Sequence, residues 1–259
     1  MIALAATLAS IAHAEPVEQR HVEHLGDGYT VVTVDLQTAE LRMFGGAGGI
    51  SMGEAKAAAE RNGATARALM NGGMYGHDDG PIGLFVLNGQ VRHTLNTNEG
   101  DGNFHLMPNG VFYVDTLGKA HVDVTSVVAT LDLATVRDAT QSGPMLLIDG
   151  AVHPEFRAES TNKLPRNGVG VSPDGNTVYL AISDGSVRFH DFATMFRDEL
   201  HCEDALFLDG VVSLLWDGGE TDFGGSSVRF GVVITASIPA PSGLREDDAY
   251  RGRHERRGR

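Results

Sequence analysis

Three short segments of this chain combine glycine with an uncharged polar residue or an aspartate directly beside an apolar run: Asn71–Tyr75, Gln141–Leu146 and Leu206–Ser213. Glycine lets the backbone approach another group closely, and the polar side chains have to leave the core. This combination is typical of a binding cleft. We therefore predict that the three segments meet at one site, where polar side chains such as Asn71 and Ser142 orient a ligand or, alternatively, cap turns.

The charge of the chain limits what this ligand can be. Residues 1–244 hold 14 basic and 30 acidic side chains, a formal charge of −16, within a total of −14. Nucleic acid is a poor partner for such a body, because its phosphate backbone requires a basic surface. An anionic ligand would need a local cation, and Arg166 offers a guanidinium fork that matches phosphate oxygens. The alternative for Arg166 is a surface salt bridge.

Two aspartates are candidates for a catalytic carboxylate. Asp209 ends an apolar strand, where an unpaired charge is costly unless it is used or paired. Asp184 stands in a similar position ahead of Gly185. For both residues the alternative is a turn aspartate before glycine.

A metal site would have to use the neighbouring residues His77, Asp78 and Asp79. Three consecutive side chains cannot all face one ion, and His105 and His121 stand at no zinc-like spacing. We therefore predict no metal and no cofactor, with calcium or magnesium the ions to test for if a site exists.

Cysteine and tryptophan each occur once. A single Cys202 excludes an internal disulfide, and we expect it to be a small buried hydrophobe at a helix end. Trp216 could stack on a sugar or lie in the core.

The elements that would position these residues are mostly strands. The β-branched run 29–36 and the segment 64–70, which leads into Asn71, predict strands. Turn pairs such as Asn88-Gly89 predict hairpins or strand ends, and the expected segments are 83–92, 104–107, 111–118, 145–150, 169–182 and a closing strand at 230–235. Helices are expected at 52–61 and at 191–200, the latter with Asp191 as its N-cap.

This pattern predicts an α+β fold, a single domain with a mixed and largely antiparallel β-sheet core and a few helices packed against it. The segment Ser172–Tyr179 also resembles one arm of a β-propeller repeat. A propeller needs several similar blades, and no second copy occurs at a fixed period, so the mixed fold is favoured.

The two ends of the chain differ from its body. Residues 1–14 form a short apolar stretch ending in Ala12-His13-Ala14, which fits the cleavage pattern of a secretory signal although no basic residue precedes it. The alternative is an ordinary N-terminal helix. We expect a domain at 15–240, a disordered Arg-rich tail at 241–259, no transmembrane segment, and a periplasmic or secreted protein of open oligomeric state.

Six motifs follow one another in a specific order: Asn71–Met74, Gly143–Gly150, Arg166–Val171, Ala181–Asp184, Phe189–Phe196 and Ala205–Gly210. Through them, over roughly residues 25–237, the chain resembles the phosphodiester glycosidase family, and within it a subgroup of small exported bacterial proteins. The last motif departs from the family pattern Leu-Asp-Gly-Gly-Gly-Ser, because Val211 and Val212 replace two glycines before Ser213. This change affects the place where glycine would let the backbone approach a phosphate.

The resemblance implies an exported hydrolase that cleaves a sugar-1-phosphodiester of an envelope or extracellular glycan. Asp209 and Asp184 would be catalytic. The implied substrate-binding residues are Asn71, Gly72, Gly73, Ser142, Gly143, Arg166, Asn167 and Ser213. The alternative is a protein of the cell envelope that binds a glycan or glycosyl phosphate without cleaving it.

Overall fold

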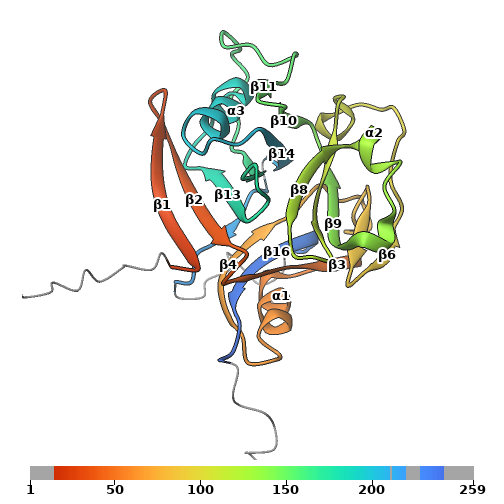
Figure 1. The fold of residues 1–259 in the computed structure, drawn as a ribbon. Coiled ribbons are helices and arrows are strands. Elements are labelled where there is room, and N and C mark those ends of the chain that lie inside the picture. Colours follow the sequence, from red (N-terminus) through yellow and green to blue (C-terminus); the bar gives the residue numbers. More distant parts are fainter. Residues whose placement is uncertain (1–14, 211, 220–227, 242–259) are drawn as a thin grey trace, which may run out of the picture.

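Three antiparallel sheets make up most of the computed structural model, which describes residues 15–210, 212–219 and 228–241 (Figure 1). Residues 1–14 and most of the predicted tail, 242–259, lie outside this range, so the predictions of a signal segment and a disordered tail stay predictions.

A seven-stranded sheet carries two of the candidate segments. Its strand order is β1 (Val17–His24), β2 (Asp27–Asp35), β13 (Thr177–Ser183), β12 (Asn167–Val171), β14 (Asp204–Asp209), β10 (Met145–Ile148) and β11 (Ala151–Val152). Turns with positive φ connect neighbours in the sheet, at Asp149 and Gly150 (50° and 76°) and at Gly175 (71°). The predicted hairpins at 145–150 and 169–182 are thus confirmed.

A four-stranded sheet supplies the Asn71 segment. It runs in the order β15 (Leu215–Trp216), β4 (Thr65–Asn71), β16 (Phe230–Ile238) and β3 (Glu40–Ile50). Helix α1 (Met52–Ala59) packs on it and begins with a capping box, in which Ser51 Oγ accepts from Glu54 N and the Glu54 carboxylate accepts from Ser51 N. The strand leading into Asn71 and the first helix are therefore where the sequence predicts them.

A five-stranded sheet completes the fold in the order β6 (Gln90–His93), β5 (Phe85–Leu87), β9 (Val136–Ser142), β7 (Gly110–Asp115) and β8 (Ala120–Val124). The short helix α2 (Thr125–Val128) and the 3-10 turns η1 (Asn103–His105) and η2 (Leu133–Thr135) lie beside it. Asn88 and Gly89 both have positive φ, 52° and 73°, as a tight hairpin turn requires.

The central core lies where the inner faces of the three sheets meet, with buried residues such as Val32, Met43, Phe112 and Leu206. Helix α3 (Phe189–Asp198) covers the other face of the seven-stranded sheet. Cys202 is buried there, and burial raises the pKa of its thiol to about 12, so it is a buried hydrophobe as expected. Trp216 packs with Met52 and Phe230 beneath α1, which supports its core interpretation over sugar stacking.

Two predicted details are wrong. Helix α3 begins two residues early, so Arg188 is its N-cap, and Asp191 lies within the first turn, where it accepts from Arg188 Nη1 at 2.8 Å. Residues 104–107 form no strand, because their backbone N–H groups make the short-range hydrogen bonds of the turn η1. In addition, Asn109 Nδ2 donates to Phe104 O at 2.9 Å.

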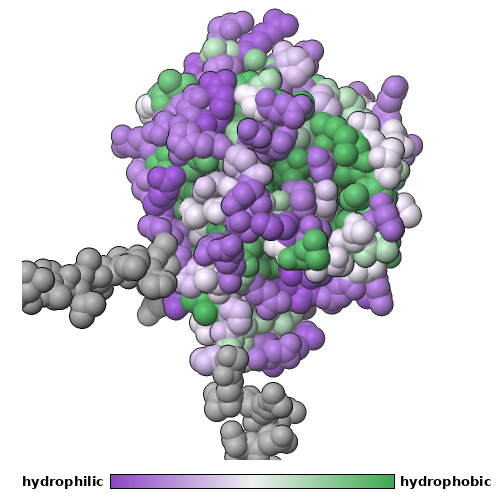
Figure 2. All heavy atoms as spheres, viewed as in Figure 1, coloured by the Kyte–Doolittle hydropathy of each residue, from purple (hydrophilic) through white to green (hydrophobic). Residues whose placement is uncertain are grey.

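Hydrophilic side chains cover most of the face in Figure 2, with apolar side chains gathered toward the five-stranded sheet. Within the described ranges, no helix is long and apolar enough to cross a membrane.

Candidate functional site

Asp209 lies at the C-terminal end of β14, where the three sheets meet, and its carboxylate is held by neutral donors. Asn71 Nδ2 donates to Asp209 Oδ2 at 3.3 Å, and Gly210 N donates to Oδ1 at 2.6 Å. Burial raises the pKa of this carboxyl, and the two hydrogen bonds offset only part of that effect. Among the described residues no cation pairs with Asp209, so its negative charge is not neutralised by the protein around it.

Asn71 is oriented by the residues behind it. Its Oδ1 accepts from Asn167 Nδ2 at 2.9 Å and from Leu214 N at 2.8 Å, and Asn167 Nδ2 also reaches Asn71 O at 3.0 Å. Both asparagines are fully buried. Because two donors hold the amide oxygen of Asn71, its NH₂ group has to face Asp209.

The glycines and the serine that the sequence predicts to bind substrate lie where hydrogen bonds join the sheets. Ser142 Oγ donates to Leu208 O at 3.0 Å, and Thr140 Oγ1 donates to Gly72 O at 2.8 Å. Added side chains would collide here: a Cβ at Gly72 would lie 2.8 Å from Ile234, and one at Gly143 would lie 2.6 Å from Asn109. Gly73, with φ of 151°, follows Gly72 in the same part of the site. These residues therefore shape the site, and the Ser142 hydroxyl donates its hydrogen bond to the protein backbone.

A cavity of about 320 Å³ opens beside Asp209, and we call it the Asp209 cavity. Its lining includes Met74, Tyr75, Ile82, Asp101, Asn103, Phe104, His105 and Val212. Burial raises the pKa of Tyr75, and the carboxylates of Asp209 and Asp79 raise it further. His105 Nδ1 lies 2.9 Å from Asn98 O, so Nε2 is the ring nitrogen that it can offer a ligand.

Asp101, Tyr75 and His105 were not among the predicted site residues. Tyr75 belongs to the first glycine segment, and that position was the only signal in the sequence that could have found it. Asp101 and His105 belong to the connection between β6 and β7, and nothing in their spacing indicates that this loop folds toward β14.

Arg166 is fully buried, which contradicts its alternative interpretation as a surface salt bridge. Its guanidinium carbon lies 3.4 Å from the ring centroid of Phe189 and 5.7 Å from that of Phe207, and Nε donates to Val187 O at 3.0 Å. Nη1 and Nη2 have no hydrogen-bond partner among the described residues. Burial lowers the pKa of this guanidinium to about 10.

Asp184 lies apart from this group. Its side chain is 45% exposed, 3.3 Å from His21 Nδ1, and accepts from Thr30 Oγ1 at 3.1 Å. Both partners belong to the β1–β2 hairpin, and Asp184 does not line the Asp209 cavity. The structure therefore does not bring the two predicted catalytic aspartates together.

Ser213 contacts the backbone at the end of β14. Its Oγ donates to Gly210 O at 2.6 Å and lies 3.1 Å from Asp209 O. Val212 lines the cavity and is 38% exposed, whereas Val211 lies outside the described residues.

A metal site would have to use His77, Asp78 and Asp79. Asp78 Oδ1 accepts from Gly80 N at 3.2 Å and so serves the local turn. In the described part of the chain, no group of three or more histidine, cysteine or acidic side chains is arranged to hold a metal ion.

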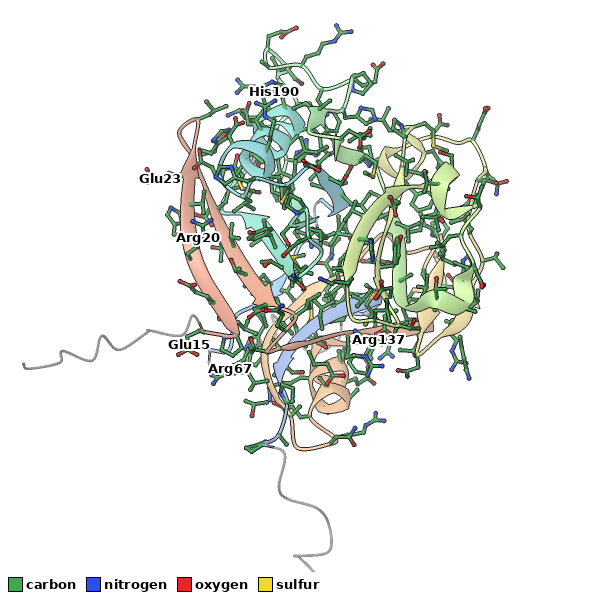
Figure 3. All side chains as sticks on the ribbon, in the orientation of Figure 1. Glu15, Arg20, Glu23, Arg67, Arg137 and His190 are labelled. Atoms are coloured by element: carbon green, nitrogen blue, oxygen red, sulfur yellow. The ribbon has the colours of Figure 1, made fainter. Side chains whose placement is uncertain are left out.

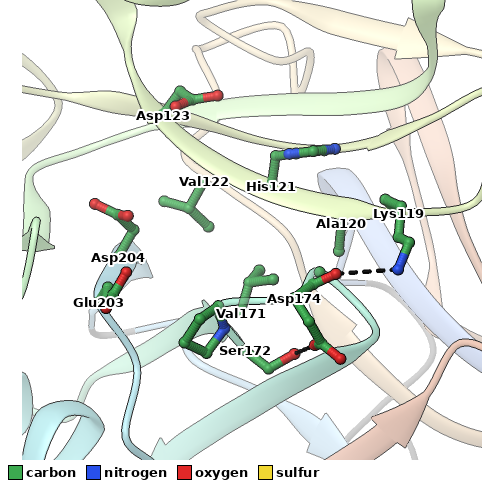
Figure 4. A pocket seen from close by; sticks show the side chains of 12 residues that line it. Lys119, Ala120, His121, Val122, Asp123, Val171, Ser172, Asp174, Glu203 and Asp204 are labelled. Carbon is green, nitrogen blue, oxygen red and sulfur yellow. Dashed lines mark hydrogen bonds between the residues drawn. The ribbon is translucent and has the colours of Figure 1, made fainter.

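A second polar pocket, of about 210 Å³, lies at the far end of β12 (Figure 4). Asp123, Glu203 and Asp204 line it, and burial together with neighbouring acidic groups raises the pKa of Asp204. Lys119 Nζ donates to Asp174 O at 3.1 Å and Nζ also donates to Asn176, so the cation there is already occupied. At the Asp209 cavity, by contrast, the donors that the described residues bring to the carboxylate are neutral, and we take this cavity as the candidate site.

Comparison with known proteins identifies the family of the chain. The sequence profile of the family described as phosphodiester glycosidase (NAGPA) matches residues 64–222, which contain Asn71, Arg166, Asn167 and Asp209. The uncharacterised protein YigE of Escherichia coli K12 is 38% identical over 152 residues, and the match covers 58% of this chain and 58% of YigE. The chain thus spans less than two thirds of the length of this relative.

Two solved structures share the fold. The catalytic domain of zebrafish N-acetylglucosamine-1-phosphodiester alpha-N-acetylglucosaminidase, auto-inhibited by its pro-peptide, superposes with a TM-score of 0.62 at 13% identity, covering 88% of this chain and 85% of the other. A hypothetical protein from Synechocystis gives a TM-score of 0.52 at 16% identity, covering 88% and 64%. The profile match extends over more than half of the sequence, and from it we conclude that this chain belongs to the phosphodiester glycosidase family.

Proposed function

We propose that this protein hydrolyses the bond between the anomeric carbon of a sugar and the phosphate of a phosphodiester. The observation that carries the proposal is the Asp209 carboxylate, which lines a cavity and is held by amides, with no cation beside it in the described structure. A buried carboxylate without a counter-charge is unfavourable for the fold, so it is better explained by a ligand than by stability.

The chemistry of the bond matches this carboxylate. Cleavage at an anomeric carbon places positive charge on the sugar ring in the transition state, and a fixed carboxylate stabilises or attacks that centre. The leaving group is a phosphate monoester, already an anion, so a strong general acid is less necessary than for an ordinary glycoside. Asn71 fixes the direction from which Asp209 approaches the sugar.

Arg166 is the proposed partner of the phosphate. It precedes Asn167, the residue that lies opposite Asp209 in the pairing of β12 with β14. Its two free Nη groups match two phosphate oxygens in a bidentate contact. Because Arg166 is fully buried, this contact requires the half-buried ring of Phe189 to turn aside when the ligand enters.

Water has to reach the anomeric carbon, and the Asp209 cavity contains the groups to activate it. His105 offers Nε2 as a base, and Asp101 supplies a second carboxylate in the same cavity. We assign the water-activating role to His105, and Asp101 replaces Asp184 as the second acidic residue at the site.

The finer predictions on substrate and location remain part of this proposal. The substrate would be a sugar-1-phosphodiester of an envelope or extracellular glycan, and the protein would be periplasmic or secreted, as the pattern at residues 1–14 suggests. Detecting the protein in the periplasmic or extracellular fraction, with residues 1–14 removed, would test this part.

A non-catalytic glycan-binding role is the second candidate. It is favoured by Val212, which lines the cavity where the family pattern has glycine, and by Ser213, whose hydroxyl donates to Gly210 O. The same cavity would then hold a glycosyl phosphate without cleaving it.

One experiment distinguishes the two proposed functions. The purified protein is incubated with a panel of sugar-1-phosphodiesters, release of reducing sugar is followed, and the assay is repeated with Asp209→Asn and with Asp184→Asn. Turnover that is lost in Asp209→Asn and kept in Asp184→Asn supports the proposed hydrolase. Saturable binding without turnover in the unmodified protein supports the binding role and rejects the hydrolase.

A further inference from the structure

Among the described residues that line the Asp209 cavity, Tyr75 alone carries a hydroxyl group, and the hydrolysis proposed above gives it no role. Tyr75 and Asp209 line the cavity together. Tyr75 also follows Asn71 in the first glycine segment, and Asn71 donates to the Asp209 carboxylate. Of the two carboxylates that raise the pKa of Tyr75, Asp209 has the larger effect. The phenol of Tyr75 therefore lies close to the carboxylate that is proposed to act at the anomeric carbon.

The aromatic ring of Tyr75 is held in place by the four-stranded sheet. It meets the ring of Phe230 edge to face, with centroids 6.3 Å apart and an interplanar angle of 87°. Strand β16 passes so close that a Cβ added at Gly231 would lie 3.0 Å from Tyr75 Cβ and 2.9 Å from Pro81 N. Because the ring is fixed by packing, its hydroxyl is a preorganised donor that needs no reorientation during a reaction.

The backbone around Tyr75 is fixed as well. Tyr75 pairs with Pro81 in an antiparallel bridge, and Asp79 turns the chain between them with a positive φ of 59°. This turn packs against β3, where a Cβ added at Gly49 would lie 2.8 Å from Asp79 O. The close contacts with β3 and β16 keep Tyr75 beside the Asp209 cavity.

The hydroxyl of Tyr75 makes no hydrogen bond to any residue in the described part of the chain. The Asp209 carboxylate does not accept from it, since the donors to the two carboxylate oxygens are Asn71 Nδ2 and Gly210 N. The raised pKa of Tyr75 keeps the phenol protonated at neutral pH. The cavity therefore contains a neutral hydrogen-bond donor that is available to a ligand.

Tyr75 differs from the other polar groups of the cavity. No lysine or arginine is among the described lining residues, and an ionised carboxylate such as that of Asp101 only accepts hydrogen bonds. His105 is already assigned to the attacking water. Asn103 is the other neutral donor, but it lies at the border of the cavity, where it also lines a neighbouring cavity. Tyr75 is thus the free neutral donor on the Asp209 side.

Hydrolysis of a glycosyl phosphodiester needs a donor at one particular atom. The bond between the anomeric carbon and the phosphate oxygen breaks, and its electron pair moves to that oxygen. A water oxygen bonds to the carbon and gives a proton to His105. Negative charge therefore grows on the leaving oxygen while positive charge grows on the sugar ring. A neutral donor stabilises the oxygen without repelling the ring, as a cation at the same place would.

We propose that the Tyr75 hydroxyl donates a hydrogen bond to the phosphate oxygen that leaves the anomeric carbon. Tyr75 keeps its proton throughout, and the phosphate monoester leaves as an anion. The inference rests on the proposed hydrolysis of glycosyl phosphodiesters and adds a catalytic residue to it.

The test combines Tyr75→Phe with a change of the leaving atom. Two diesters are compared that differ only in the atom between the anomeric carbon and phosphorus, which is oxygen in one and sulfur, a weak hydrogen-bond acceptor, in the other. We expect Tyr75→Phe to lower kcat/KM about thirtyfold for the oxygen diester, the effect of one hydrogen bond to a charged group, and less than about threefold for the sulfur diester. Tyr179→Phe removes a half-buried phenol hydroxyl from β13, outside the Asp209 cavity, and should leave both values unchanged.

An unchanged kcat/KM in Tyr75→Phe, or equal losses with the two diesters, would overturn the inference without touching the hydrolase proposal. The ratio between the diesters does not depend on the amount of folded protein, so a folding defect cannot imitate the expected result. If the unmodified protein cleaves neither diester, their dissociation constants are measured by NMR titration. Binding of the oxygen diester alone that weakens about threefold or more in Tyr75→Phe keeps the contact although the hydrolase has failed. Equal binding in the variant, or no binding at all, rejects the contact as well.

Discussion

Asp138 and Asp209 are both carboxylates at places where strands of different sheets meet, yet the protein surrounds them differently. Arg42 Nε and Arg137 Nε donate to Asp138 at 2.9 and 3.0 Å, and its side chain has no exposed surface. Arg137 also donates to Leu41 O, which ties β9 to β3 (Figure 3). Within the part of the chain that the structure describes, Asp209 receives only the amides of Asn71 and Gly210, and it lines a cavity. The first carboxylate is neutralised inside the fold, and the second is the one that we propose for a ligand.

Arg166 extends the same comparison to cations. Arg42 is paired with Asp138 and Glu40, and these carboxylates raise its pKa despite its burial, whereas burial lowers the pKa of Arg166 to about 10. One charge pair stabilises the junction of two sheets. Asp209 ends β14 and Arg166 directly precedes β12, the neighbouring strand, and neither side chain has an ion pair within the described residues. In the proposed function, they serve the two ends of a glycosyl phosphate bond.

Asp138→Asn should show the largest effect on stability. The substitution removes the carboxylate that Arg42 and Arg137 share and leaves Arg42 paired with Glu40, and we expect the free energy of unfolding in urea to fall by about 3 kcal/mol. Asp209→Asn is the matched control, with an expected change below about 1 kcal/mol because no cation loses a partner. Equal losses in the two variants would break the comparison.

Asn71→Ala should come next, because this amide serves both the fold and the site. It leaves Asn167 Nδ2 and Leu214 N without their side-chain acceptor, which we expect to cost about 2 kcal/mol of unfolding free energy. Turnover should fall together with stability, since Asp209 loses its orienting donor. A variant with full stability and full turnover would show that the amide network has no role.

Arg166→Met should separate stability from ligand binding. Replacing an unpaired buried guanidinium by an apolar side chain is expected to leave the free energy of unfolding unchanged or raise it by about 1 kcal/mol. The increase in Tm that inorganic phosphate gives the unmodified protein should vanish in the variant, with sodium chloride at equal ionic strength as the control. A large loss of stability combined with a retained phosphate effect would make Arg166 structural.

The smallest effect is a pH dependence. The pKa of Asp209 is raised in the folded protein above its ordinary value of 3.8. Between these two pKa values, the native state holds a proton that the unfolded state has lost. Stability due to this group is therefore present below pH 3.8 and is lost as pH rises through the raised folded pKa. The unfolding free energy of Asp209→Asn relative to the unmodified protein should increase over this window, and a difference that is flat with pH would contradict the raised pKa.

Local patterns in the sequence explain why part of the site could be predicted. Asn71, Ser142 and Asp209 each end a strand beside glycine, and strand ends of different sheets do meet here. The turn pairs Asn88-Gly89 and Asp149-Gly150 likewise predict their hairpins, because their positive φ values are a property of the residues themselves.

Other features depend on long-range packing that no short pattern shows. Asp184 follows β13 and faces the β1–β2 hairpin, and its position after an apolar strand is the same as that of Asp209. Arg166 is charged but buried because α3 and the ring of Phe189 cover it. Asp101 and His105 reach the site through the conformation of one long connection, which strand and turn signals do not determine.

The central claim, that Asp209 is kept for chemistry and not for stability, is tested by measuring kcat/KM and the free energy of unfolding on the same preparation of Asp209→Asn. We expect turnover of a sugar-1-phosphodiester to fall at least about a thousandfold, while the free energy of unfolding is unchanged or slightly higher. Retained turnover together with a loss of several kcal/mol, the result expected for Asp138→Asn, would contradict the account.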